Sequence, residues 1–291
     1  MEGRRAVGIV SPGAMGSAVG YALREGGARV VATLAGRSER TRAFANRAGI
    51  ESVPDLAALV REAGVVLSIA PPARAEEIAA DVARAAGPAG VRTLLVEMNA
   101  IAPASVRRIA AATSDAVDVV DGSISGPPPW RAGTTRIYLS GPRAGEIAAL
   151  PFAGVSVTVA GAEVGTASAV KMCTASVYKG TSALLVHALL TARANGVLEH
   201  VLDDLGESLP ELLDGAERTI ASAATKAERY VGEMLEIAAT QEEAGLPAGL
   251  FGSMAGVYAA LSLRPLARQA PEELADDLTL DEVLEALKPV D

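Results

Sequence analysis

Short apolar runs alternate with longer amphipathic segments through the first 160 residues of the chain. The apolar runs are rich in Val, Ile and Leu, and most are followed by a segment with helical spacing. In chain order they are AVGIV, RVVATL, VVLSIA, TLLVEM, AVDVVDGS, TRIYLSG and VSVTVAG. Strands separated by helices of this length predict βαβ units in a parallel sheet covered on both faces. Right-handed crossovers then give a doubly wound fold.

The pattern changes near residue 161. From Gly165 onward the strand-like runs stop, a long helical run reaches about Arg193, and further helical segments follow to the end of the chain. We therefore expect an α/β Rossmann domain with a mainly parallel sheet over residues 1–160, followed by an all-α domain over residues 161–291. The helical pattern is too elongated to bury all of its apolar faces alone, which predicts a homodimer through the C-terminal helices.

Composition narrows the class of protein. Half of the residues are hydrophobic but only 3% are aromatic, so the core must be built from Ala, Val, Leu and Ile. A net charge of −9 argues against a nucleic-acid partner, and no stretch predicts a membrane span or a signal peptide. The single cysteine, Cys173, rules out an intrachain disulfide and favours a cytoplasmic location. We expect it to be a small core residue, and we predict no metal site.

The turn SPGAMG, residues 11–16, follows the first predicted strand. It resembles the dinucleotide-binding pattern G-x-G-x-x-G, with Ser11 in place of the first glycine and Gly13 and Gly16 in the second and third places. The second glycine lets a pyrophosphate approach the backbone, and the third lets the helix pack on the strand. The turn therefore predicts a cofactor loop, and a purely structural strand-turn-helix is the alternative.

The end of the second predicted strand tests the cofactor. NAD enzymes place an acidic residue there to bind the ribose hydroxyls, but this chain has Gly36, followed by Arg37, Ser38 and Arg40. Two arginines and a hydroxyl suit the 2′-phosphate of NADP(H). Basic residues in the first turn of a helix oppose its dipole, which favours a bound anion there. The alternative is that Ser38 is only a helix N-cap.

Two lysines lie in an otherwise uncharged helical segment, Thr166 to Ala192. Lys171, Ala175, Tyr178 and Ser182 share one helical face, with Lys179 at its edge. A lysine facing a cleft between the domains could exchange a proton with a carbonyl or hydroxyl oxygen. The alternative is that one or both lysines extend to the surface. We interpret His187 and His200 as packing or surface residues.

Five segments together resemble the β-hydroxyacid dehydrogenase and 6-phosphogluconate dehydrogenase superfamily over nearly the whole chain: GIVSPGAMGSAVG, VLSIAPP, VEMNAIAP, DGSISGPPP and GTASAVKM. The C-terminal helices resemble a phosphogluconate-dehydrogenase-like branch. The resemblance implies that Lys171 is the catalytic residue. The expected cofactor contacts are Ser11, Pro12, Gly13, Ala14, Met15, Gly16, Arg37, Ser38, Arg40, Ala70, Pro71 and Asn99. The expected substrate contacts are Ser123, Ser125, Gly126, Pro127, Tyr178 and Lys179.

Besides Ser11, the chain departs from the family pattern at two places. Thr174 and Ala175 stand where an asparagine usually follows the lysine, and Pro127 replaces the second glycine of the substrate loop. Trp130 either forms a wall of the substrate site or packs beneath this loop. We expect an NADP-dependent oxidoreductase that acts on a small hydroxy acid or carbonyl compound. An imine reductase on the same scaffold and a non-catalytic NADP-binding redox sensor are the alternatives.

Overall fold

The computed structural model of the chain describes residues 6–90 and 92–288. The chain forms two compact units, residues 1–172 and 173–291. The first unit thus includes the start of the long helix that follows the predicted boundary at residue 160. The predicted fold class is confirmed. A mostly parallel sheet with flanking helices comes first, and in the described part of the chain only helices follow it.

One eight-stranded sheet forms the centre of the first unit, in the order β3-β2-β1-β4-β5-β6-β7-β8. Neighbouring strands are parallel except β6 and β7, which are antiparallel. The sequence pattern missed β3, which is short, mostly exposed and polar. The strands are β1 (Ala6–Val10), β2 (Val30–Thr33), β3 (Glu51–Val53), β4 (Ala63–Ser68), β5 (Thr93–Glu97), β6 (Val117–Ser125), β7 (Arg136–Ser140) and β8 (Ser156–Gly161).

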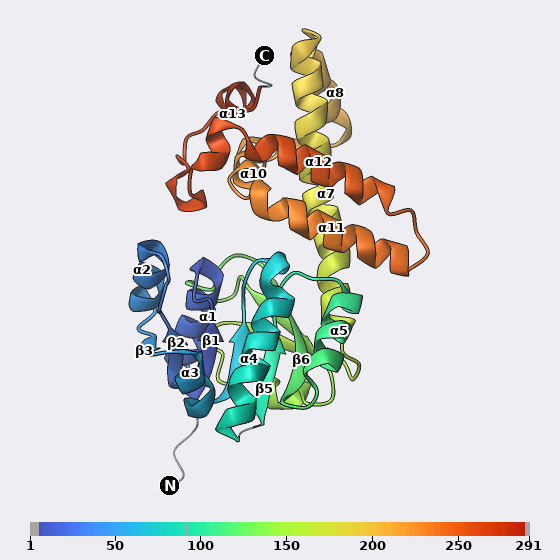
Figure 1. Cartoon of the computed structure of the whole chain (residues 1–291). Coiled ribbons are helices and arrows are strands. Elements are labelled where there is room, and N and C mark those ends of the chain that lie inside the picture. The colour runs from blue at the N-terminus through green and yellow to red at the C-terminus, as the bar shows by residue number, and fades with distance from the viewer. Residues whose placement is uncertain (1–5, 91, 289–291) are drawn as a thin grey trace. The chain divides into compact units, whose positions relative to one another are not determined.

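Helices cover both faces of the sheet (Figure 1). One apolar core joins the sheet to α1, α2 and α6, and a second joins the opposite face to α3, α4 and α5. Both cores contain many small residues, including Ala45 and Ala79, which have no exposed surface. The helices are α1 (Ala14–Glu25), α2 (Glu39–Arg47), α3 (Leu56–Glu62), η1 (Pro72–Arg74), α4 (Ala75–Ala89), α5 (Pro103–Thr113) and α6 (Ala144–Ala148).

The second unit is helical throughout its described residues. The long predicted helix is α7 (Thr166–Ala194), which begins in the first unit, and α11 packs against α12. The helical run over residues 208–245 is interrupted where Pro210 starts α9 and where Gly215, at φ 66°, precedes α10. The remaining helices are α8 (Leu198–Ser208), α9 (Pro210–Leu213), α10 (Ala216–Ala224), α11 (Ala227–Glu243), α12 (Gly249–Ser262), η2 (Pro265–Arg268), η3 (Pro271–Glu273) and α13 (Leu280–Ala286).

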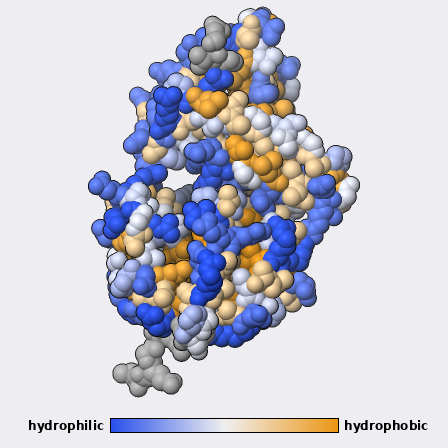
Figure 2. Space-filling model, in the orientation of Figure 1, coloured by the Kyte–Doolittle hydropathy of each residue, from blue (hydrophilic) through white to orange (hydrophobic). Residues whose placement is uncertain are grey.

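Apolar side chains remain exposed on the helical unit. Figure 2 shows them gathered over α11 and α12, among polar residues. The large exposed apolar residues include Val177 and Leu184 on α7, Leu235 on α11 and Leu250 on α12. Exposed apolar area of this kind is a candidate contact surface between chains. Among the described residues, no helix is long and apolar enough to cross a membrane.

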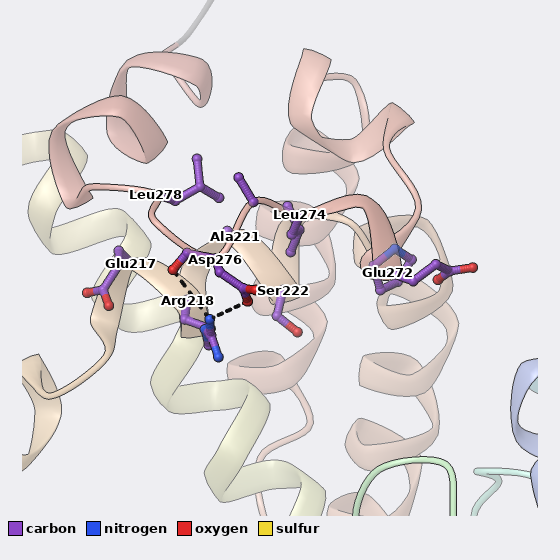
Figure 3. Close-up of a pocket in the computed structure, with 10 residues that line it drawn as sticks. Glu217, Arg218, Ala221, Ser222, Glu272, Leu274, Asp276 and Leu278 are labelled. Carbon is purple, nitrogen blue, oxygen red and sulfur yellow. Dashed lines mark hydrogen bonds and ion pairs between the residues drawn. The ribbon is translucent and has the colours of Figure 1, made fainter. Parts of the chain in front are cut away.

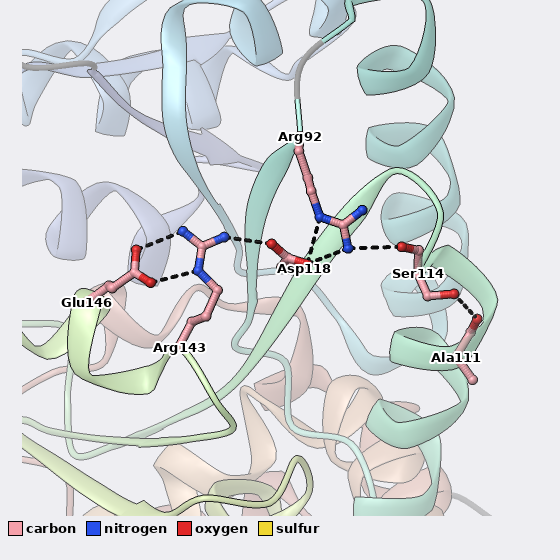
Figure 4. A network of polar contacts seen from close by, with 6 residues as sticks. All are labelled: Arg92, Ala111, Ser114, Asp118, Arg143 and Glu146. Atoms are coloured by element: carbon pink, nitrogen blue, oxygen red, sulfur yellow. Dashed lines mark hydrogen bonds and ion pairs between the residues drawn. The ribbon is translucent and has the colours of Figure 1, made fainter.

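A polar network joins β6 to its surroundings in the first unit (Figure 4). Asp118 accepts hydrogen bonds from Arg92, which also reaches the Ser114 carbonyl, and from Arg143, whose other nitrogens donate to Glu146. These hydrogen bonds, with that from Arg92 first, hold the pKa of Asp118 below its usual range. The network connects β6 with the residues that precede β5 and α6, and it leaves Asp118 about one-quarter exposed.

Candidate functional site

The predicted cofactor and substrate segments lie at one edge of the sheet. They follow β1, β2, β4, β5 and β6, all of which run parallel, so their carboxyl ends meet at the same edge. Strand order reverses between β1 and β4, because the chain passes from β1 outward to β2 and β3 and then returns to the other side of β1. Ligands of open α/β sheets bind at such a switch point, outside the carboxyl ends of the strands.

The turn between β1 and α1 is shaped by Ser11 and Gly16. Ser11 adopts φ 67°, and among the described residues it is the only non-glycine with a positive φ. The serine therefore occupies a backbone conformation that favours glycine, as the pattern predicts. A Cβ at Gly16 would lie 2.9 Å from the Ser11 carbonyl oxygen, so this glycine is needed for the turn.

Gly13 has a different role from Gly16. A Cβ added at Gly13 would meet no atom within 4 Å among the described residues, so open space lies in front of this residue. Gly13 is also the N-cap of α1, and within the described chain no side chain caps this helix. A helix start with uncapped N–H groups and open space in front of it suits a phosphate group.

The segment after β2, which is predicted to bind the 2′-phosphate of the cofactor, contains a turn at Gly36 and the N-cap of α2 at Ser38. Gly36, at φ 69°, turns the chain, and Arg37 and Arg40 follow it as predicted. The Ser38 hydroxyl accepts the Thr41 N–H at 3.3 Å, so Ser38 is the N-cap of α2, which was the alternative interpretation. The first turn of α2 also contains Glu39, whose negative charge is favoured at this end of the helix, so the helix dipole gives little support for a bound anion there.

Asn99 connects the loops after β4 and β5. Its side-chain amide donates to the Ser68 hydroxyl at 3.0 Å, and its carbonyl oxygen accepts the Ala70 N–H. Asn99 is buried, so it shapes the Ala70–Pro71 loop that the sequence assigns to the cofactor. Its own N–H donates to the buried carboxyl of Glu97 at 2.9 Å, and burial raises the pKa of Glu97 to about 8.

The structure brings Lys171 to the segment predicted to bind substrate. Its Nζ donates to the Ile124 carbonyl oxygen at 2.7 Å, one residue before Ser125 and Gly126. Lys171 is half-buried and lies in the same compact unit as the glycine turn. A lysine ammonium therefore lies at the end of β6, at the same edge of the sheet as the segments predicted to bind the cofactor.

A buried carboxylate that the sequence interpretation missed holds the helix of Lys171. Asp121 lies within β6 with no exposed surface. Its Oδ2 accepts hydrogen bonds from the backbone N–H groups of Gly165 and Ser168 and from the Ser140 hydroxyl, and its Oδ1 accepts the Ser168 hydroxyl. The signal in the sequence is weak, because β6 contains a second acidic residue, Asp118, which has a different role, and two serines.

Ser123 also contacts this helix. Its hydroxyl is buried and donates to the Ala167 carbonyl oxygen at 2.8 Å. This hydroxyl therefore helps to fix α7, and the substrate contact of Ser123 stays a prediction.

The loop after β6 is shaped by Gly126. This residue has φ 108°, and a Cβ there would lie 2.3 Å from the Thr134 carbonyl oxygen. The Pro127 carbonyl accepts the Thr135 hydroxyl at 2.6 Å, which closes the base of the loop. Trp130 packs on the Tyr21 ring, 5.5 Å between centroids, and beneath the Arg47 guanidinium, so the alternative of a packing role describes it.

The polar face predicted on α7 is not a single exposed stripe. Tyr178 is exposed, whereas Ala175 and Ser182 are buried. Lys179 does not extend to the surface, because its ammonium pairs with the buried carboxylate of Glu233 and lies 4.5 Å from the Tyr230 ring. Glu233 therefore engages the charge of Lys179, and the assignment of Lys179 to the substrate stays a prediction.

Two further predictions have definite outcomes. Cys173 is exposed, so its assignment to the core is wrong. His187 and His200 are surface residues, which agrees with their interpretation. Among the described residues, no group of three or more His, Cys, Asp and Glu residues could hold a metal ion.

A pocket of about 410 Å³ lies in the helical unit, between α10 and the segment around η3 (Figure 3). Arg218 on its wall donates to the Asp276 carboxylate at 2.9 Å, and both side chains are largely exposed. None of the residues predicted for catalysis or binding lines this pocket.

One family model and one curated relative each match part of the chain. Residues 192–261 match a family described as a domain of unknown function (DUF1932). An uncharacterized 28.5 kDa protein of Methanothermus fervidus is 27% identical over 173 residues, which cover 60% of this chain. The match spans 65% of the length of that curated relative.

Solved structures match over nearly the full chain. A conserved protein of unknown function, described as structurally similar to 3-hydroxyacid dehydrogenases, is 29% identical with a TM-score of 0.66, covering 88% of this chain and 96% of that one. A 3-hydroxyisobutyrate dehydrogenase of Salmonella typhimurium has a TM-score of 0.71 at 16% identity, covering 97% and 99%.

A reductive aminase of Aspergillus terreus, in complex with NADPH and ethyl levulinate, has a TM-score of 0.57 at 18% identity, covering 89% and 94%. The chain therefore has the fold of 3-hydroxyacid dehydrogenases and related reductive aminases, and the resemblance identified from its motifs is confirmed.

Proposed function

We propose that this chain is an NADP-dependent oxidoreductase that interconverts a small hydroxy acid and its carbonyl form, with Lys171 as the general acid and base. The observation that carries the proposal is the hydrogen bond from Lys171 Nζ to the Ile124 carbonyl, 2.7 Å long. This hydrogen bond holds the Lys171 ammonium beside Ser125 and Gly126, at the edge of the sheet where the glycine turn after β1 also lies. Fold likeness to dehydrogenases adds support, although a fold alone does not determine an activity.

The residues present fit a dinucleotide cofactor. The uncapped start of α1 and the open space before Gly13 would receive the pyrophosphate, and the Ala70–Pro71 loop held by Asn99 would border the nicotinamide. When bound, the cofactor supplies or accepts a hydride. The fold neighbours include a reductive aminase in complex with NADPH and an imine reductase in complex with NAD⁺.

The preference for the phosphorylated cofactor rests on the segment after β2. Gly36 removes the acidic side chain that would repel a 2′-phosphate, and Arg37 and Arg40 supply two guanidinium groups close to the carboxyl end of the strand. Arg40 lies 5.5 Å from the Phe44 ring, which keeps its side chain along α2. Ser38 contributes through its backbone position, because its hydroxyl caps the helix.

Lys171 would supply the proton that carbonyl reduction requires. An ammonium in hydrogen-bonding reach of the substrate oxygen donates a proton as the carbonyl becomes an alcohol, and the neutral amine accepts it in the reverse direction. The Ile124 carbonyl oxygen accepts one of the three N–H bonds of the ammonium and directs the group toward the end of β6. Ser125 and the Gly126 backbone would orient the carboxylate of the substrate.

An imine substrate is the second candidate, and the likeness to a reductive aminase is the observation that favours it. In that reaction the proton must be delivered to nitrogen instead of oxygen. A panel of hydroxy acids, keto acids and cyclic imines, assayed by NADPH absorbance, separates the two reactions. Binding of NADPH without turnover of any of them would favour a redox sensor.

The decisive test compares Lys171→Met with wild type on the best substrate of this panel. We expect turnover to fall by about 10²–10⁴, the usual contribution of a general acid or base. The dissociation constant for NADPH should stay within about twofold, because the phosphate-binding turn is a separate segment. Wild-type affinity for NADPH should exceed that for NADH at least about tenfold, the factor carried by one charge-assisted contact. Unchanged turnover in Lys171→Met would contradict the assigned role.

A further inference from the structure

We infer that Asp121 is a positioning residue, which fixes the start of α7 so that Lys171 meets the end of β6. The inference rests on the proposed function, because it gives a catalytic purpose to the placement of Lys171. Its structural basis is the set of four hydrogen bonds to this one buried carboxylate, two of them from backbone N–H groups around the first turn of α7.

The first turn of a helix has N–H groups with no partner inside the helix. Here the Thr166 N–H is accepted by the Glu163 carbonyl oxygen, and the next two N–H groups are accepted by side chains of β6 and β7 in the sheet. Asp121 accepts the N–H groups of Gly165 and Ser168, and the Ser140 hydroxyl accepts that of Ala167 at 3.0 Å. A carboxylate at this end is also favoured by the helix dipole.

The same contacts fix both the rotation of α7 about its own axis and its position along that axis. Ala167 lies one turn before Lys171, and both of its backbone polar groups are bound: its N–H to Ser140 and its carbonyl to Ser123. A helix rises 1.5 Å and turns about 100° per residue, so a slip of one residue would turn Lys171 away from Ile124. Errors of about 1 Å in the placement of a catalytic group can reduce rates about 10²-fold.

Asp121 is therefore set apart from the other acidic residue of its strand. Asp118 lies three residues earlier in β6 and pairs with Arg92 and Arg143, which both lie outside α7 (Figure 4). The pair provides a matched comparison, because Asp118→Asn and Asp121→Asn make the same chemical change in the same strand. Asparagine keeps the shape of the side chain, but its NH₂ group faces N–H donors that need an acceptor.

The first measurement needs no substrate. Lys171 is labelled with trace acetic anhydride in the full chain, its rate is measured by mass spectrometry, and Lys288 serves as the internal reference. In Asp121→Asn we expect the relative rate at Lys171 to rise at least about tenfold, because loss of a charge-assisted hydrogen bond shifts the opening of this turn by that factor or more. Asp118→Asn should stay within about twofold of wild type. A folded Asp121→Asn protein that labels like wild type would overturn the inference.

If Asp121→Asn does not fold, Ser140→Ala and Ser168→Ala replace it, because each removes one hydroxyl partner and leaves the carboxylate in place. Each should raise labelling of Lys171 about threefold or more, and wild-type rates in both would overturn the inference.

The second measurement separates positioning from general stability. We expect Asp121→Asn to lower kcat about 10–10²-fold, with the Kd for NADPH within about twofold of wild type. A fall in NADPH affinity equal to the fall in kcat would show a general loss of structure and would overturn the positioning role. The two proposals remain distinguishable: faster labelling in Asp121→Asn together with full activity in Lys171→Met would support the structural grip of Asp121 and refute the function assigned to Lys171.

Discussion

Removal of the Lys179 ammonium should destabilise the helical unit. Lys179 on α7 and Glu233 on α11 form an ion pair whose side chains are 12% and 6% exposed. Lys179→Met keeps most of the bulk of the side chain and leaves the Glu233 carboxylate buried without this partner. Breaking a buried pair from one side costs about 3–5 kcal/mol, whereas an exposed pair contributes about 0–1 kcal/mol.

The surroundings of Glu233 place the expected loss between these limits. Arg229 remains 3.1 Å from the other carboxylate oxygen, but it is half-exposed and compensates only in part. The ring of Tyr230 also loses its cation. We therefore expect the free energy of unfolding to fall by about 2–4 kcal/mol, which at a urea m-value of about 2 kcal/mol/M lowers the midpoint by about 1–2 M.

Two probes assign the change to the correct unit. Trp130 is the single tryptophan of the chain and lies in the first unit, so its fluorescence follows that unit, while far-UV circular dichroism follows both. We expect the dichroism transition to move to lower urea in Lys179→Met. Glu233→Gln supplies the second single variant, and the double variant should recover at least about 1.5 kcal/mol relative to the sum of the two. Loss of less than about 0.5 kcal/mol in Lys179→Met would refute the reasoning.

Three further predictions concern other features. Ser11→Gly should keep NADPH binding and leave the free energy of unfolding unchanged or raise it by up to about 1 kcal/mol, because glycine removes the cost of φ 67°, and Ser11→Val should lower it, as measured by urea unfolding. Burial raises the pKa of Glu97 to about 8, so the folded protein retains a proton that the unfolded chain releases near pH 4.5. The free energy of unfolding should therefore fall as the pH rises from 4.5 to 8, with a slope approaching 1.4 kcal/mol per pH unit, about the energy of one pKa unit. Urea unfolding followed by Trp130 fluorescence at several pH values measures this slope. The same slope in Glu97→Gln as in the wild type would contradict the assignment to Glu97. We also expect a homodimer by light scattering that Leu184→Glu on the exposed apolar face of α7 converts to monomer, and a wild-type monomer near 29.5 kDa would exclude it.

Local patterns in the sequence predicted most of the fold. The apolar strands β1, β2, β4 and β5 and the turn at Ser11 follow from short segments whose period and glycines are visible in one dimension. The short edge strand β3 has no apolar signal, since two of its three residues are exposed. Its place depends on pairing with β2, which is a long-range contact that no local pattern contains.

The candidate site was predictable where a single residue stands out from its segment. Lys171 is recognisable because a lysine is unusual in a helix of small residues, but its contact with Ile124 and the grip of Asp121 join residues more than 40 positions apart. Lys179 is also a lysine among small residues of the same helix, so the local sequence does not distinguish it from Lys171. Only the folded structure places Glu233 of α11 beside the Lys179 ammonium. Ser38 differs from these residues, because its role as the N-cap of α2 was predictable from its position alone, before the first turn of a helix.

The small side chains of the two sheet cores determine which substitutions this protein tolerates. Replacing a buried valine such as Val82 by alanine removes two methyl groups and should cost only about 1–2 kcal/mol, whereas a branched side chain at Ala18 or Ala79 has no space to enter. Gly20 is stricter still, because a Cβ there would lie 2.8 Å from an Ile50 methyl group. Random mutagenesis for stability or new substrates should therefore recover enlarging substitutions in the loops at the carboxyl edge of the sheet and almost none inside α1 and α4. The helix-to-sheet spacing would thus stay constant while the loops diversify.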